Sequence, residues 1–556
     1  MSTQQIPLAA DIRGEAFPVL TEEQISRIRP LTRIRKVNVG DILFEPGDSD
    51  IPFFVLLSGS MEIVQPELRG ESPIVDHGAG EFTGEITMIS GRRCLVRGRV
   101  TAAGEFLEMS SQDLRTLVAR DAELSEIFMR AFILRRVELI NRGQGNVILL
   151  GSRHSAPTLR LREFLTRNGH PHTYVDLDTD TSYQDLLDHF QVKLDQIPVV
   201  ICNNQTVLRN PSIQELARCL GLNSNITASE VRDLVIVGAG PSGLAAAVYA
   251  ASEGLDVLVL EAESPGGQAG SSSKIENYLG FPMGISGNEL AGRAAAQAQK
   301  FGAKVLIANT VTRLNCERRP YELTVDCGQV IRARTVVIAS GAQYNKPKID
   351  NLTQFEGQGI YYGATYIEAQ LCGKDDVIVV GGGNSAGQAA VYLSQMAGRV
   401  HMLVRSRRLS DTMSRYLIQR IEENPMISLH YRTEIVGLEG GTQLERVTWQ
   451  DKNTGESSSH DIRHVFIMTG ASPRTDWLKG CVMLDNKGFI LTGRDLDPVA
   501  QEFKWTLPRA PQMFETSLPG VFAVGDVRAG NVKRVASAVG EGSISIYLVH
   551  RALAEL

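Results

Sequence analysis

The spacing of hydrophobic and polar positions changes several times along the chain, and each change marks a new type of element. From about residue 38 to 109, short apolar runs are separated by turn signals such as Glu45-Pro46-Gly47-Asp48, a pattern typical of β-strands joined by tight turns. Residues 111–141 then repeat apolar positions at helical spacing without Gly or Pro, which predicts one long helix. Strands followed by a long helix predict a small α+β domain.

The next segment, residues 145–223, alternates between the two periods. An apolar strand, a helix, a second strand and a second helix follow one another, then a strand begins after Pro198 and a helix closes the segment. Alternation of strands and helices predicts a small α/β domain.

Two later segments share one order: strand, glycine-rich turn, helix, strand. In the first, the turn holds Gly238, Gly240 and Gly243. The first glycine lets the strand turn sharply, the second lets the backbone approach a pyrophosphate, and the third lets the helix pack on the strand. Glu261 ends the second strand, where a carboxylate accepts a hydrogen bond from an adenosine ribose. The segment predicts a dinucleotide-binding domain.

The second copy differs at the position of the acid. Its turn holds Gly381 and Gly383, and its second strand ends in Val404-Arg405, with Arg407 and Arg408 close behind. Arginines attract a 2′-phosphate that an acid would repel, so this copy predicts NADPH rather than NADH. The alternative is that these arginines form only a solvated loop.

Composition excludes several other classes of protein. The 556 residues are enough for three or four domains, and 57 Lys+Arg against 63 Asp+Glu give a net charge of −6, which argues against a nucleic-acid binder. The basic run from Arg27 to Lys36 is interpreted as a solvated helix face or a linker. No apolar run is long enough to cross a membrane and the N-terminus does not resemble a signal peptide, so we expect a cytoplasmic protein without membrane contact.

Cysteine and histidine spacing gives no metal site. The seven cysteines are scattered and no two are spaced as C-x-x-C, so we expect reduced, mostly buried thiols. The histidines show no metal-ligand spacing, and we predict no metal.

Residues 231–556 resemble a low-molecular-weight thioredoxin reductase, a class II pyridine nucleotide-disulfide oxidoreductase. The resemblance rests on GAGPSGLAAAVYAA, the loop GGQAGSSSKIENYLGFP at 266–282, VVIASGA at 336–342, GGGNSAGQAA at 381–390 and GVFAVGDV at 520–527. It implies a homodimer with two Rossmann-like domains: an FAD domain in two pieces (231–345 and 470–556) and an NADPH domain (346–469) inserted between them.

The resemblance and the fingerprints together assign the cofactor-binding residues. In the C-terminal piece, Asp526 would accept from a ribityl hydroxyl and the helix that starts near Val535 would stabilise charge on the flavin. The residues assigned to FAD are Gly238, Gly240, Pro241, Ser242, Gly243, Glu261, Gly267, Gln268, Asn277, Gly341, Gly525, Asp526, Arg534 and Val535. Those assigned to NADPH are Gly381, Gly383, Asn384, Ser385, Arg405 and Arg408.

The redox dithiol that this resemblance implies is missing. Its two cysteines would fall on Ala364 and Ile367, and Cys372 stands alone five residues later. We therefore assign no catalytic residue, because a single thiol does not complete dithiol exchange. Electrons from NADPH would reach FAD and leave to an external acceptor: a quinone, ferredoxin, a metal complex, oxygen or the thiols of a partner protein.

The first 142 residues resemble a cyclic-nucleotide-binding domain with its β-roll. In that family a glutamate binds the ribose and an arginine nine residues later binds the cyclic phosphate. Gly84-Glu85 matches the first part, but Cys94 stands at the arginine position, with Arg92 and Arg93 just before it. These four residues, Gly84, Glu85, Arg92 and Arg93, are the candidate ligands of a cyclic nucleotide, and a degenerate docking module is the alternative.

Residues 145–223 resemble a glutaredoxin-type thioredoxin fold. Pro198 falls where that family keeps a cis-proline, and the family's C-x-x-C would fall on Ser155-Ala156-Pro157-Thr158. Hydroxyls do not form a disulfide, so we expect a binding or spacer module. The chain as a whole is predicted to be an NADPH-dependent FAD oxidoreductase; the alternatives are a thioredoxin-disulfide reductase using partner thiols and a ligand-regulated flavin redox sensor.

Overall fold

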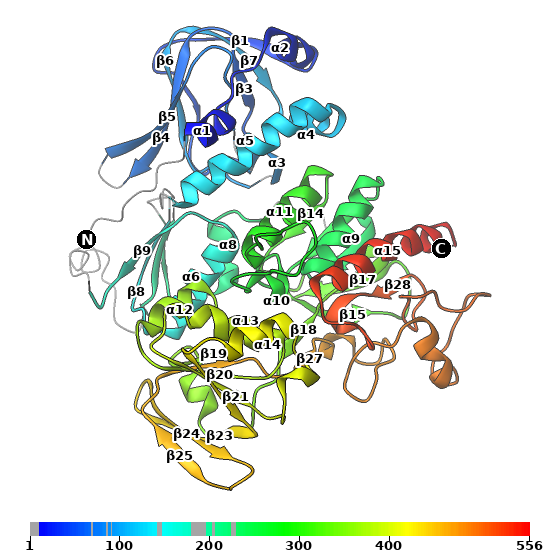
Figure 1. Cartoon of the computed structure of the whole chain (residues 1–556). Coiled ribbons are helices and arrows are strands. Elements are labelled where there is room, and N and C mark those ends of the chain that lie inside the picture. The colour runs from blue at the N-terminus through cyan, green and yellow to red at the C-terminus, as the bar shows by residue number, and fades with distance from the viewer. Residues whose placement is uncertain are drawn as a thin grey trace.

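The computed structural model describes residues 10–67, 70–84, 87–90, 92–141, 147–179, 196–202, 206–223 and 230–555. Four units follow from these residues (Figure 1): a β-roll at the top, a small α/β unit below it, and two larger α/β units beneath and beside them. This arrangement is the multidomain fold expected from the sequence.

The N-terminal unit packs two antiparallel sheets, in the orders β1-β7-β3 and β2-β6-β4-β5, against helices. Its core is aromatic: the ring centroids of Phe82 and Phe128 lie 4.8 Å apart, and Phe53 and Phe132 pack against them. The elements are α1 (Ala10–Ala16), α2 (Glu22–Ile28), η1 (Arg29–Leu31), β1 (Arg33–Val37), β2 (Ile42–Phe44), β3 (Phe53–Leu56), β4 (Ser60–Glu67), β5 (Gly70–His77), α3 (Thr87–Ser90), β6 (Arg97–Ala102), β7 (Gly104–Met109), α4 (Ser111–Arg120) and α5 (Ala122–Asn141).

Two predictions for this unit are wrong in detail. The single helix expected over 111–141 is two helices, because Asp121 adopts an extended backbone and its carboxylate caps the second helix at the Leu124 N–H. The basic run at 27–36 is neither a linker nor one helix face. It ends in strand β1, and Arg27 and Arg33 form ion pairs of 2.6 Å with Glu123 and Glu108.

The small α/β unit has one sheet of order β11-β10-β8-β9, in which β8 and β9 are parallel and β10 runs antiparallel to β8. The Ile197–Pro198 peptide is cis, as predicted. Its elements are β8 (Val147–Gly151), α6 (Ala156–Arg167), β9 (Thr173–Asp176), β10 (Val199–Cys202), β11 (Thr206–Arg209) and α8 (Ile213–Cys219).

The third unit is built from two pieces of sequence. Its seven-stranded sheet has the order β14-β13-β12-β17-β16-β15, with the late strand β28 paired in parallel to β17. Its elements are β12 (Val231–Val237), α9 (Pro241–Ser252), β13 (Val257–Leu260), α10 (Gly267–Gly270), α11 (Gly287–Lys300), β14 (Lys304–Leu306), β15 (Val311–Asn315), β16 (Tyr321–Val325), β17 (Val330–Ile338), η5 (Asp476–Leu478), η6 (Gly493–Val499), β28 (Val521–Ala523), η7 (Gly525–Val527) and α15 (Val535–Glu555).

The fourth unit is inserted into the third, and β18 (Ala342–Tyr344) and β27 (Ala471–Pro473) pair where the chain passes between them. It holds a parallel sheet of order β19-β26-β20-β21-β22 and a three-stranded antiparallel sheet, β23-β24-β25. Its elements are η3 (Leu352–Phe355), β19 (Ile360–Tyr361), α12 (Tyr366–Cys372), β20 (Val377–Val380), α13 (Asn384–Leu393), β21 (Val400–Val404), η4 (Leu409–Asp411), α14 (Arg415–Glu422), β22 (Ile427–Tyr431), β23 (Thr433–Gly440), β24 (Leu444–Asp451), β25 (Ser457–His460) and β26 (His464–Ile467).

The expectation that all cysteines are reduced is wrong for one pair. Cys316, at the end of β15, and Cys481, after η5, form a disulfide with 5.8 Å between their Cα atoms. Sequence spacing gave no sign of it, because the two residues are 165 positions apart on opposite sides of the inserted unit. The disulfide joins the two pieces of the third unit.

The described residues hold no group of three or more His, Cys, Asp or Glu placed to bind a metal. Within the same residues, no helix is long and apolar enough to cross a membrane.

Candidate dinucleotide and nucleotide sites

The turn between β12 and α9 has the geometry predicted for a pyrophosphate site. Gly238 adopts φ +105°, and a side chain on Gly243 would collide with the Gly238 carbonyl, so helix and strand pack as closely as predicted. Gly240 caps α9 without a side-chain hydrogen bond, and a Cβ on it would meet nothing nearer than the Gly267 Cα at 4.0 Å. The N–H groups at this helix end therefore face an open approach, which suits a phosphate.

Glu261 lies beside the same turn. One oxygen accepts the Ala239 N–H at 2.7 Å and the other accepts the Glu263 N–H at 2.9 Å. Burial raises the pKa of Glu261, and the two backbone donors oppose this rise. The predicted ribose-binding residue is thus fixed at the end of β13 by the phosphate-binding turn itself.

The Gly525-Asp526 segment meets this turn from the other piece of sequence. A Cβ on Gly525 would meet the Ser242 Oγ at 2.5 Å, and one on Gly542 would collide with the Ser242 carbonyl, so α15 crosses α9 at that point. Burial raises the pKa of Asp526. Arg534 is exposed and Val535 is half-buried at the start of α15.

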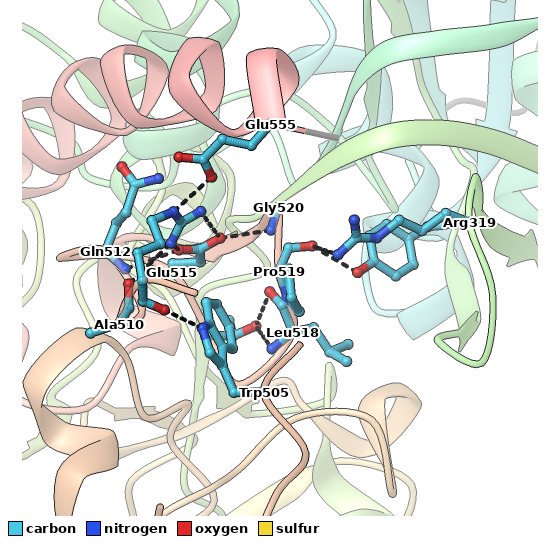
Figure 2. A network of polar contacts seen from close by, with 12 residues as sticks. Arg319, Trp505, Ala510, Gln512, Glu515, Leu518, Pro519, Gly520 and Glu555 are labelled. Carbon is cyan, nitrogen blue, oxygen red and sulfur yellow. Dashed lines mark hydrogen bonds and ion pairs between the residues drawn. The ribbon is translucent and has the colours of Figure 1, made fainter. Parts of the chain in front are cut away.

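A buried ion pair supports the strand that leads to Asp526 (Figure 2). Glu515 is completely buried, and its carboxylate accepts the Gln512 N–H at 2.9 Å, the Gly520 N–H at 2.8 Å and the Arg509 guanidinium at 2.5 Å. Arg509 also pairs with Glu555 at the end of α15. Sequence reasoning missed this network, because its partners share no periodic pattern.

The second glycine turn, between β20 and α13, is also open. Gly381 has φ +148°, and a Cβ on it would collide with the Met468 carbonyl. Gly383 caps α13 without a side-chain bond, and nothing lies within 4 Å of a Cβ built on it. Asn384 has a different role from a phosphate ligand in this structure, because its Oδ1 accepts the Ser414 N–H at 2.8 Å.

The arginine loop lies against this turn. The Thr412 hydroxyl donates to the Gly382 carbonyl at 2.7 Å, which holds residues 405–412 beside the glycines. Arg405 is exposed, and Arg408 is 74% exposed with a 3.6 Å ion pair to Asp411. Both guanidiniums are therefore accessible to a 2′-phosphate on a dinucleotide bound at the turn.

Tyr344 connects the two sites, and the sequence did not single it out. It lies on β18, its hydroxyl forms a hydrogen bond with Ser385 in the first turn of α13, and it is close enough to Asp526 for that charge to act on its pKa. Burial is the largest influence and raises the pKa of Tyr344. The start of α13 therefore faces the Asp526 side of the other site.

The remaining residues assigned to FAD lie in and after α10 and after β17. The Gln268 amide donates to the Ala342 carbonyl at 2.6 Å, and the Gly267 carbonyl accepts from Arg167 of α6 at 2.9 Å. Gly341 has φ +65° with open space around a Cβ, while Asn277 is exposed in the loop after α10.

Ala364 and Ile367 are buried near the contact between α6 of the small α/β unit and α12. They are 6% and 5% exposed, and Ala364 belongs to an apolar cluster against which Leu159 of α6 packs. Arg162 of α6 donates to the Gln370 amide oxygen of α12 at 3.3 Å. Helix α6 thus covers the face of α12 that the resemblance associates with the dithiol.

The β-roll encloses a small cavity. Its volume is about 60 Å³, and Phe17, Cys94, Arg135 and apolar side chains line it. The Arg135 guanidinium donates to the Gly84 carbonyl at 2.7 Å and lies 5.0 Å from the centre of the Phe17 ring. Ligand pockets for small molecules are usually several hundred Å³, so this cavity by itself is smaller than such a pocket.

The candidate nucleotide ligands that the structure describes, Gly84, Arg92 and Arg93, do not lie in one site. Gly84 reaches the cavity, whereas Glu85 lies outside the described residues. Arg92 donates to the Asn168 carbonyl at 3.0 Å, and Arg93 packs against Gly221, so both arginines lie at the boundary with the small α/β unit.

Comparisons with known proteins match two parts of the chain. Residues 232–542 match the family model described as "Pyridine nucleotide-disulphide oxidoreductase", and residues 34–121 match a cyclic nucleotide-binding domain. The chain is 32% identical over 329 residues to a thioredoxin reductase of Streptomyces clavuligerus, covering 59% of this chain and 96% of that protein. It is 29% identical to one of Mycoplasmopsis pulmonis, covering 58% and 97%.

Solved structures give the same result. The thioredoxin reductase of Lactococcus lactis, in its FR conformation, is 26% identical with a TM-score of 0.52, covering 58% of this chain and all of that one. The enzyme of T. acidophilum is 29% identical with a TM-score of 0.51, covering 58% and 98%.

Both open glycine turns fit a dinucleotide, and the arginine loop fits the 2′-phosphate of NADPH. FAD and NADPH are the cofactors of this family, and the chain is an NAD(P)H-dependent flavoprotein oxidoreductase with an N-terminal cyclic-nucleotide-binding domain. From the matched family model, the relatives and the two glycine turns, the chain belongs to the pyridine nucleotide-disulphide oxidoreductase family.

Proposed function

We propose that the protein transfers electrons from NADPH through FAD to an external acceptor without an internal redox dithiol. The observation that carries the proposal is that Ala364 and Ile367, which stand at the two dithiol positions, are buried residues without a thiol. Neither side chain exchanges disulfides, and Cys372 in the same helix is buried, with its pKa raised to about 12 by burial.

The residues around the two sites have distinct parts in this reaction. Arg405 and Arg408 bind the 2′-phosphate, and the start of α13 binds the pyrophosphate. Bound FAD supplies the hydride acceptor and passes the electrons on. Tyr344 bonds to Ser385 and lies within reach of the Asp526 charge, so it would hold the start of α13 toward the FAD site.

The contact between α6 and α12 favours one class of electron acceptor. A thioredoxin-disulfide reductase using partner thiols would have to present those thiols to the flavin, and the α12 face is occupied by Leu159 and Arg162. We therefore favour a quinone, ferredoxin, a metal complex or oxygen, reduced directly at the flavin. The reaction consumes NADPH, an intracellular reductant, so we infer a cytoplasmic location.

An anaerobic experiment tests this function. The purified holoenzyme is mixed rapidly with NADPH or NADH while flavin absorbance is followed, and the candidate acceptors are then added. We expect NADPH to bleach the flavin of the wild type faster than NADH does. Arg405→Glu should lose this preference for NADPH. Arg446→Glu, which replaces an exposed arginine on β24, should keep it. Full NADPH preference in Arg405→Glu contradicts the phosphate assignment, and turnover of thioredoxin contradicts the acceptor assignment.

A second function, a ligand-regulated redox sensor, is favoured by one set of contacts between units. Arg92 of the β-roll donates to the Asn168 carbonyl, and the Asn168 amide donates to the Glu263 carbonyl at 3.2 Å, next to the ribose-binding turn. A ligand that moves the β-roll would act on this turn. Calorimetry with cyclic AMP and cyclic GMP, followed by flavin reduction with each ligand present, tests it; binding without a change in reduction rate rejects it.

We also propose that the protein is a homodimer, as the family resemblance implies. Tyr249 on α9 and Ile544 and Tyr547 on α15 are 46%, 51% and 64% exposed, and the two helices pack side by side. Sedimentation velocity distinguishes monomer from dimer, and we expect a dimeric wild type and a monomeric Tyr547→Glu variant. A monomeric wild type contradicts the proposal.

A further inference from the structure

The small α/β unit has exactly two cysteines in its sequence, and the fold brings them together. Cys202 is the last residue of β10 and is completely buried, and Cys219 is the last residue of α8 and is half-buried. Their side chains form a hydrogen bond with each other, and both pack against the same apolar cluster. Neither lies near Ser155 or Thr158, where the resemblance places a dithiol.

The two thiols differ in environment. Burial and the neighbouring sulfur raise the pKa of Cys202, whereas the hydrogen bond with Cys202 and the guanidinium of Arg93 lower the pKa of Cys219. Arg93 comes from the β-roll and packs against Gly221, two residues after Cys219. Cys219 is thus the more accessible and the more acidic thiol, and Cys202 is a buried neighbour in contact with it.

We propose that Cys202 and Cys219 form a redox site whose substrate is a hydroperoxide. The Cys219 thiolate attacks the O–O bond, takes one oxygen and releases an alcohol or water, becoming a sulfenic acid. The Cys202 thiol then attacks that sulfur, a disulfide forms, and water leaves. In total two thiols are oxidised, the hydroperoxide is reduced by two electrons, and the products are a disulfide, water and the alcohol, or two waters from hydrogen peroxide.

The end of α8 that carries Cys219 contacts both the FAD unit and the β-roll. The Asn223 side chain, just after α8, both donates to and accepts from the Ile307 backbone of the FAD unit, at 2.8 and 2.7 Å. Arg93 ties the same end of α8 to the β-roll. A disulfide that draws Cys219 toward β10 therefore acts on two unit boundaries at once.

Peptide mapping of the full-length protein tests the pairing. The holoenzyme is treated briefly with hydrogen peroxide, its remaining thiols are alkylated, and it is digested with trypsin without reduction. Trypsin releases Cys202 in peptide 194–209 and Cys219 in peptide 219–232. We expect these two peptides to be linked and lighter than their sum by two hydrogen atoms.

Variants separate the pairing from simple thiol damage. In Cys202→Ala the link should be lost and Cys219 should gain two oxygen atoms, because no resolving thiol remains. Cys327→Ser, which removes an exposed lone cysteine, should leave the link unchanged. Alkylation of both thiols after peroxide treatment of the wild type, or a doubly oxygenated Cys219 there, overturns the proposal.

The contribution of Arg93 has its own measurement. The Arg93 charge lowers the pKa of Cys219, so Arg93→Gln lowers the thiolate fraction and should slow formation of the link by about twofold to tenfold. Arg92→Gln is the matched control, because Arg92 bonds to the Asn168 carbonyl and does not act on Cys219. Equal rates in the wild type and Arg93→Gln overturn the part assigned to Arg93.

Discussion

Replacing Glu515 by Gln removes the charge at the centre of the network beneath β28 and leaves the shape of the side chain unchanged. Glu515 accepts two N–H groups of the Arg509 guanidinium and the backbone N–H groups of Gln512 and Gly520, and it is completely buried. A glutamine keeps one acceptor oxygen. Its amide nitrogen would face groups that only donate, so Arg509 loses its buried partner and keeps the partly exposed Glu555.

Removing one member of a buried ion pair costs about 3–5 kcal/mol, because the other charge stays buried without compensation. The FAD unit has about 200 residues in its two pieces, and for that size each kcal/mol corresponds to about 2–4 °C in melting temperature. We therefore expect the melting temperature of Glu515→Gln to fall by about 6–20 °C. Because Glu515 lies just before the strand that leads to Asp526, FAD should also bind more weakly.

The assay is thermal unfolding followed by circular dichroism, with and without excess free FAD, alongside Glu555→Gln as the control. Glu555 pairs with the same Arg509 but is 34% exposed, so its loss should cost less than about 1 kcal/mol. Equal melting temperatures for the two variants would refute the reasoning, because they would show that burial of the pair has no energetic consequence.

Three further predictions concern other parts of the chain. Cys316→Ser should lower the stability of the FAD unit by about 4–5 kcal/mol in chemical unfolding, because it removes the disulfide. The disulfide closes a loop of 165 residues, or of about 34 when β18 and β27 stay paired. Equal unfolding midpoints for the wild type with and without a reductant would contradict this. Tyr344→Phe should slow flavin reduction by NADPH about fivefold in rapid mixing, because the hydrogen bond that holds Ser385 is lost. Equal rates in the variant and the wild type would refute this. Glu368→Gln should stabilise the protein above pH 7 and have little effect near pH 4.5. Burial and then the Glu163 charge raise the pKa of Glu368 to about 7, so its charged form is unfavourable in the fold. Melting curves of the variant and the wild type at both pH values check this, and an equal effect at the two pH values would argue against it.

Local patterns were enough to predict the two dinucleotide turns. Gly243 is required by its contact with the Gly238 carbonyl in the same turn, and Gly238 and Gly381 adopt φ of +105° and +148°, a backbone conformation that favours glycine. The same holds for the cis peptide at Pro198, which a short resemblance placed correctly.

Contacts between distant segments were not predictable in this way. The Cys316–Cys481 disulfide, the Tyr344–Ser385 hydrogen bond and the packing of Leu159 on the α12 cluster join residues with no common spacing. The break at Asp121 also escaped prediction, because the apolar period continues across it and only the capping carboxylate shows where one helix ends. Sequence patterns therefore predicted each unit better than the way the units meet.

The pairing of β28 with β17 also has a consequence for biosynthesis. Val336 and Val521 are neighbours in the FAD sheet but lie about 185 residues apart in the chain. At about 5–20 residues per second, a ribosome needs about 10–40 s to pass from one to the other. During that interval β17 waits without its late neighbour while the inserted unit is made. A nascent chain arrested before β28 should therefore be a target for chaperones, and FAD should be captured only after α15 has left the ribosome.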